Sequence, residues 1–126
     1  MEDPTLVQMD AELHALHRET QMPCVCFTSQ AKGFLAKMAA GGEVALSDKA
    51  KRRYLCAENL ELLERTREIA RTMDVSVSSV ALAYLTGQPF PCFPIAGASK
   101  MEQILSLREA GDLCLTARQV EILRGF

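Results

Sequence analysis

Two short apolar runs, at residues 24–27 and 92–95, constrain the fold more than any other feature of the sequence. The first, Cys-Val-Cys-Phe, follows Pro23 and has no charged or amide side chain, which is typical of a strand buried on both faces. The second, Cys-Phe-Pro-Ile, contains Pro94, which removes one hydrogen-bond donor from a strand. A strand covered on both faces needs helices on either side, so these runs predict a helix-rich α/β fold.

The segments around the two runs carry helical patterns. Apolar residues recur at three- and four-residue steps over 9–20 and 57–73, and the stretch 76–87 is apolar nearly all round. Two more helices are predicted. One covers residues 100–107, with Ser99 as a candidate cap, and the other covers residues 117–124, with Thr116 as its N-cap.

His14 and His17 stand three residues apart in the first of these helices. This spacing can present two imidazoles to one metal, but no carboxylate or cysteine stands at a helical offset that completes a recognisable site. The helix itself is predicted from the spacing of Met9, Leu13 and Leu16. We therefore interpret the two histidines as a surface pair.

The five cysteines are an odd number and include no Cys-x-x-Cys pair, so a disulfide framework is not expected. Alternate residues of a strand face the same way, so Cys24 and Cys26 are predicted to point to one side. Two thiols can bind a soft metal, but cysteine is among the most buried residue types and no second pair follows at a finger-like spacing. We therefore predict packing here, with no metal or redox site.

Charge and hydropathy exclude several function classes. The 126 residues carry 14 Lys plus Arg against 16 Asp plus Glu, a formal net charge of -2. No global positive field therefore favours nucleic acid or an anionic membrane. No apolar segment reaches the roughly 20 residues that span a bilayer, and residues 1–4 lack the opening of a secretory signal. We expect a cytoplasmic protein with neither nucleic acid nor membrane as partner.

Four segments resemble motifs of the aldo/keto reductase family, in the family's order and spacing. Residues 22–35 resemble its seventh-strand region, and residues 81–85 resemble its Ala-Leu-Ala-Trp segment. Residues 94–104 are similar to its eighth-strand signature, Pro-Ile-Pro-Gly-Ala-Ser-Lys followed by Gln-Leu, with Ala96 in place of the second proline. Residues 113–116 resemble the Leu-x-Leu-Thr that opens its last helix.

The resemblance implies both a fold and a reaction. The family folds as a (β/α)8 barrel of roughly 250 or more residues. Residues 1–126 are therefore expected to be one partial domain, the carboxyl-terminal portion of a TIM barrel, with about two short parallel strands and flanking helices. The family reduces carbonyls by hydride transfer from NADPH through an Asp, Tyr, Lys and His tetrad in earlier strands. No segment matches those motifs, so we assign no catalytic residue and predict that the chain alone is inactive.

By the same resemblance, the chain keeps the family's cofactor side. Phe27 takes the place of the aromatic residue that stacks on the nicotinamide. The positions that contact the pyrophosphate are Thr28, Gln30 and Lys32, and those around the adenosine 2′-phosphate are Gly97, Ser99, Lys100 and Gln103. Helix N–H groups, a hydroxyl and an ammonium suit a dianion, so NADPH is favoured over NADH.

Two features of the resemblance point away from a self-sufficient enzyme. Ser106 and Leu107 replace a Glu-Asn pair that contacts adenine in the family, and the leucine side chain makes no hydrogen bond, so the resemblance does not imply an adenine contact at Leu107. Two strands also leave unpaired edges and apolar faces. We expect another copy of the chain or the missing amino-terminal half to cover them. The alternative function is a non-enzymatic helical module for self-association or assembly.

Overall fold

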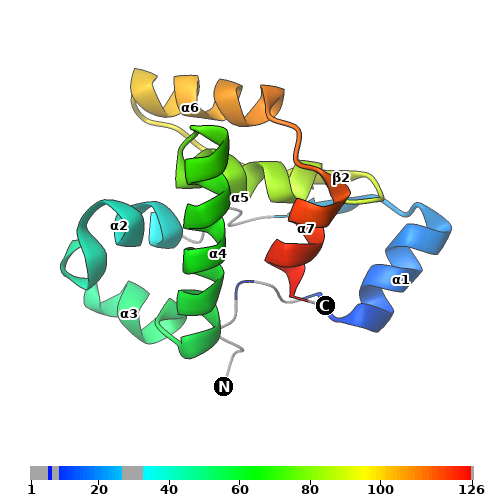
Figure 1. The fold of residues 1–126 in the computed structure, drawn as a ribbon, viewed down its shortest axis with the longest axis horizontal. Helices are drawn as coiled ribbons and strands as arrows, with labels where there is room; N and C mark the ends of the chain where they lie inside the picture. Colours follow the sequence, from blue (N-terminus) through cyan, green and yellow to red (C-terminus); the bar gives the residue numbers. More distant parts are fainter. Residues whose placement is uncertain (1–5, 7–8, 27–32, 126) are drawn as a thin grey trace.

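The computed structural model describes residues 6, 9–26 and 33–125, which form a helix-rich α/β fold. The elements in chain order are α1 (Ala11–Thr20), β1 (Cys24–Cys26), α2 (Phe34–Gly41), the 3-10 helix η2 (Gly42–Ala45), α3 (Asp48–Tyr54), α4 (Ala57–Met73), α5 (Val77–Thr86), β2 (Cys92–Pro94), α6 (Met101–Asp112) and α7 (Ala117–Arg124). Helix α4 lies between α2 and α7, and α6 packs along α5 (Figure 1). The prediction of two short parallel strands among helices is confirmed.

Local sequence signals determine where several helices begin and end. Ser76 and Thr116 accept hydrogen bonds from backbone N–H groups of the first turns of α5 and α7, as predicted. Asp74 ends α4 in the left-handed conformation, at φ 55°. Helix α6 extends past its predicted end at residue 107 to Asp112. None of the helices in the described ranges is long and apolar enough to cross a membrane.

The core lies among the helices. Phe34 of α2 is fully buried, and its ring centroid lies 5.9 Å from that of Tyr54 at the end of α3. A second cluster joins α4, α5 and α7. The buried residues of the two clusters are Phe34, Met38, Leu46, Ala50, Tyr54 and Leu63, and Leu62, Ile69, Ala70, Val80 and Leu123. Helix α4 contributes to both clusters and therefore holds them together.

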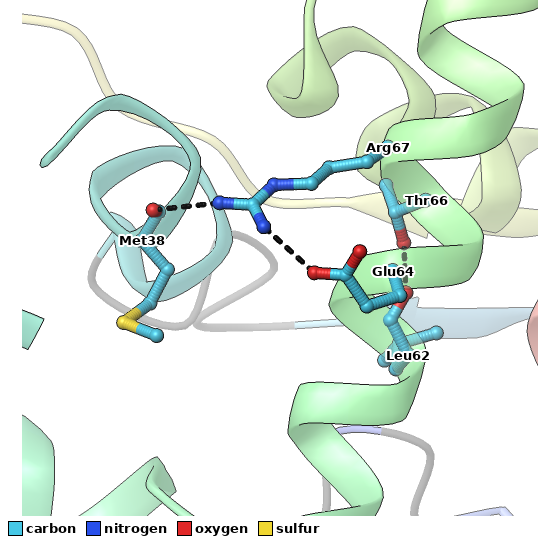
Figure 2. Close-up of polar contacts among 5 residues, drawn as sticks. All are labelled: Met38, Leu62, Glu64, Thr66 and Arg67. Atoms are coloured by element: carbon cyan, nitrogen blue, oxygen red, sulfur yellow. Dashed lines mark hydrogen bonds and ion pairs between the residues drawn. The ribbon is translucent and has the colours of Figure 1, made fainter. Parts of the chain in front are cut away.

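A polar contact on the surface also ties α2 to α4 (Figure 2). Arg67 of α4 donates a hydrogen bond to the carbonyl oxygen of Met38 at 3.0 Å and pairs with Glu64 at 2.7 Å. The neighbouring Thr66 is buried, and its hydroxyl donates to the carbonyl oxygen of Leu62 at 2.6 Å. The buried hydroxyl of Thr66 therefore keeps a hydrogen-bond partner on the core side of α4.

The two strands form a parallel pair in which Pro94 is accommodated between ladder bonds. The Cα partners are Cys24 and Cys92, Val25 and Phe93, and Cys26 and Pro94. Cys24 N donates to Pro91 O at 2.9 Å, and Ile95 N donates to Cys26 O at 2.8 Å. The lack of an N–H group at Pro94 therefore removes neither of these two interstrand hydrogen bonds.

The prediction that the first strand is buried on both faces is wrong for the described chain. Val25 is 61% exposed and its partner Phe93 is 56% exposed. On the opposite face Cys92 is buried, and α5 packs against β2. The helices of the described chain therefore cover one face of the pair and leave the other open.

The prediction of a surface histidine pair on α1 is also wrong. His14 and His17 are buried, whereas Leu13 and Leu16 are exposed. The ring centroid of Phe90 lies 5.5 Å from that of His14 and 5.1 Å from that of His17. The contacts of both imidazole rings with Phe90 stabilise the orientation in which this face of α1 points toward the protein.

Candidate cofactor site

The carboxyl ends of β1 and β2 lie at one edge of the sheet, because the strands are parallel and Cys26 pairs with Pro94. Ligands of parallel α/β folds and barrels usually bind at this edge. From β2 the chain leads through an exposed loop, residues 95–99, to Lys100, the N-cap residue of α6. The predicted order of strand, small-residue loop and helix N-terminus is therefore confirmed.

Three of the predicted phosphate contacts come together at this N-terminus. The Gln103 side-chain oxygen accepts hydrogen bonds from the backbone N–H groups of Ser99, at 2.8 Å, and Lys100, at 3.2 Å. The Ser99 hydroxyl lies 3.3 Å from the same oxygen. Gly97 is exposed on the preceding loop, and a Cβ placed on it would meet no atom within 4 Å. The cluster is therefore open to solvent.

The structure corrects the expected cap of α6. Ser99 lies one residue before the N-cap, and the side chain that accepts hydrogen bonds from the backbone at this helix start is that of Gln103. Because its carbonyl oxygen already accepts from two backbone N–H groups, an anion that used the same groups would have to displace it. The amide thus competes with a ligand for the helix N-terminus.

The position of α6 depends on a contact with α5. The Glu109 carboxylate accepts hydrogen bonds from the Ser79 hydroxyl at 2.6 Å and from the backbone N–H of Ser76 at 3.4 Å. These two bonds lower the pKa of Glu109, that from Ser79 most strongly. The ionised carboxylate therefore binds the second half of α6 to the start of α5.

The structure describes only some of the other positions that were considered for the cofactor. The four at the first strand end, Phe27, Thr28, Gln30 and Lys32, lie outside the described residues. Ser106 and Leu107 are half-buried on α6, in the turn that follows Gln103.

One group of side chains that could bind a ligand was not predicted from the sequence. Cys24 and Cys26 point to the same side of β1, as predicted, with their sulfurs 3.7 Å apart. The sulfur of Cys92 lies 3.6 Å from that of Cys26 and completes a group of three thiols. The signal available in the sequence was that both apolar runs begin with cysteine, which places the two cysteines opposite each other in a parallel pair in register.

A comparison with models of known families identifies the family of the chain. The model of the aldo/keto reductase family matches residues 6–126, which is nearly the whole chain. A search of curated proteins found no significant match. The family match includes both strands and the loop that leads into α6. The chain belongs to the aldo/keto reductase family.

Proposed function

We propose that the chain binds NADPH as the carboxyl-terminal, cofactor-holding part of an aldo/keto reductase-like oxidoreductase, and that it does not transfer hydride by itself. The observation that carries the proposal is the exposed cluster of Ser99, Lys100 and Gln103 at the N-terminus of α6. This cluster stands at the carboxyl edge of a parallel strand pair in a chain of a family of NADPH-dependent reductases.

The donors at this cluster fit the 2′-phosphate of NADPH. Helix α6 has 12 residues, so its first turn carries the positive end of a substantial helix dipole. The Ser99 hydroxyl and the Lys100 ammonium add a neutral and a charged donor, the combination that suits a phosphate dianion. The Gln103 oxygen marks the direction in which the two backbone N–H groups donate.

The roles of the chain's own residues are binding and orientation. When bound, NADPH supplies the hydride for reduction of a carbonyl. Lys100 and Ser99 hold the phosphate end, and the exposed Gly97 lets the cofactor approach the loop backbone. No segment of the sequence matches the family's four catalytic motifs, so the proton donor has to come from another part of the enzyme.

Titration with NADPH, followed by the cofactor's fluorescence, tests the proposal, with NADH as the ligand that lacks the 2′-phosphate. We expect saturable binding that prefers NADPH. Lys100→Ala should weaken it about ten- to a hundredfold, because a hydrogen bond to a charged group contributes about 1.5–3 kcal/mol. Lys49→Ala, at an exposed lysine of α3, is the matched control and should leave binding unchanged.

Two results would contradict the proposal. One is no binding up to about 1 mM NADPH, a free energy weaker than about −4 kcal/mol. The other is NADPH-dependent turnover of a reactive aldehyde by the purified chain, which would contradict the predicted inactivity.

The open face of the strand pair favours the second candidate function, self-association. Val25, Phe93 and Ile95 are large apolar side chains that are each more than half exposed. A copy of the chain offers the same exposed apolar face, so a symmetric pair can cover both faces. Sedimentation at several concentrations should then detect a dimer that Phe93→Ser dissociates. A strict monomer would contradict this candidate.

A further inference from the structure

Three cysteine sulfurs from two strands converge on one face of the sheet. The sulfur of Cys26 lies 3.7 Å from that of Cys24 and 3.6 Å from that of Cys92, and all three lie within 4.8 Å of one another. A metal bound to three thiolates at about 2.3 Å keeps the sulfurs about 4 Å apart. The thiols therefore already stand at the spacing of a metal–thiolate group.

The strand pair holds this arrangement in place. The parallel register sets Cys24 opposite Cys92, and ladder bonds lie on both sides of the group. These are the bonds from Cys24 N to Pro91 O at 2.9 Å and from Ile95 N to Cys26 O at 2.8 Å. Ligands carried by paired strands lose little freedom on binding, so the site is preorganised.

Exposure and coordination number indicate which ion fits. Cys24 and Cys26 are half-buried, so an ion can reach them without unfolding the chain, whereas Cys92 is buried. Within the described residues no histidine, carboxylate or fourth cysteine joins the group. Structural zinc sites almost always have four protein ligands, whereas soft thiolates alone also suit Cu(I).

We propose that Cys24, Cys26 and Cys92 form a binding site for one Cu(I) ion, held by three thiolates. Binding forms three copper–sulfur bonds and releases the three thiol protons to solvent. The oxidation state of the copper does not change, and the group formed carries two negative charges. None of these three cysteines belongs to the cofactor cluster of Ser99, Lys100 and Gln103, so the proposal does not rest on NADPH binding.

Burial raises the pKa of Cys26 and of Cys92, and the neighbouring thiols add to the effect at Cys92. Metals bind the thiolate form of cysteine, so copper has to displace the protons of these two thiols.

Anaerobic titration of the reduced chain with Cu(I), in competition with a coloured Cu(I) chelator, tests the site. We expect one equivalent of copper to bind in preference to Zn²⁺. Loss of a supporting contact outside the metal's own ligands costs 10- to 100-fold in affinity, so Cys26→Ser should weaken binding by about 100-fold or more. The matched control is the double variant Cys56→Ser and Cys114→Ser, which removes the two cysteines outside the group and should bind copper normally.

A second readout needs no variant and therefore does not depend on how a variant folds. X-ray absorption at the copper edge of the loaded, unaltered chain should report three sulfur neighbours. Copper binding that survives in Cys26→Ser, or that disappears in the Cys56 and Cys114 control, would overturn the assignment. Tighter binding of Zn²⁺, a different sulfur count, or failure to compete with the chelator would overturn it as well.

Discussion

Two phenylalanines lie in contrasting environments, one in the helical core and one in the strand pair. Phe34 is fully buried between α2 and the end of α3, whereas Phe93 in β2 is 56% exposed on the open face of the sheet. Both lie in segments that match the family. The helices therefore form a closed core of their own, whereas the strands present an apolar face that the described helices do not cover.

The largest effect is expected in the closed region. Phe34→Ala removes a ring with no exposed surface from the cluster that joins α2, α3 and α4. Truncations of buried phenylalanine typically cost about 3–5 kcal/mol of unfolding free energy. Urea unfolding followed by circular dichroism measures the loss. A loss below about 1 kcal/mol would mean that this cluster is not the core.

A smaller loss is expected from Asn59→Ala. The Asn59 side chain is buried, accepts a hydrogen bond from Leu6 N at 2.8 Å and donates one to Tyr54 O at 2.7 Å. Its removal leaves buried backbone groups without these partners, which costs about 1–3 kcal/mol. Urea unfolding followed by circular dichroism measures the loss. Equal stability of Asn59→Ala and the parent chain would contradict the role of these bonds.

The buried histidine face of α1 should make stability depend on pH. Burial, followed by the charges of Arg124 and Arg18, lowers the pKa of His14. Below about pH 6.5, the ordinary histidine pKa, the unfolded chain therefore binds more protons at this position than the folded chain does. Stability from this group is complete above about pH 6.5 and declines as the pH falls toward the lower folded-state pKa.

Unfolding midpoints at about pH 7.5 and about pH 5, either side of the ordinary histidine pKa, measure this dependence. His14→Gln cannot titrate, so its midpoint should fall less between the two pH values than that of the parent chain. An identical fall in both proteins would place the pH dependence elsewhere.

The smallest effect is expected on the open face. Phe93→Ala should change the unfolding free energy of the monomer by no more than about 0.5 kcal/mol, as for other exposed positions. The measurement is made at low protein concentration, so that any dimer is dissociated. A loss approaching that of Phe34→Ala would contradict this difference between the two regions, because it would mean that the strand face is covered in the isolated chain.

The parts of the fold that could be predicted from the sequence are those that local chemistry determines. Periodic leucines and the caps Ser76 and Thr116 located α4, α5 and α7, since a helix start needs only a side chain that accepts from its own first turn. The burial of β1 and of α1 could not be predicted in the same way. Whether Val25 or Leu13 is covered depends on what packs against it from elsewhere in the chain.

The two candidate sites also differ in how far they could be predicted from the sequence. The loop and helix that carry Ser99, Lys100 and Gln103 are contiguous, so their resemblance to a family motif located them. The thiol group needed the register of two strands that are distant in the sequence. The spacing of the cysteines within the first strand indicated that Cys24 and Cys26 lie together, but it could not indicate that Cys92 lies beside them.

The pairing of β1 with β2 has a consequence for folding. Cys26 and Cys92 are 66 positions apart, and the chain between them contains the helices α2 to α5. Contacts between distant residues form after local ones, because loop closure costs entropy before the contact stabilises the chain. We therefore expect the strands to meet only after α4 and α5 have formed. Copper uptake during refolding should then occur later than the appearance of helix.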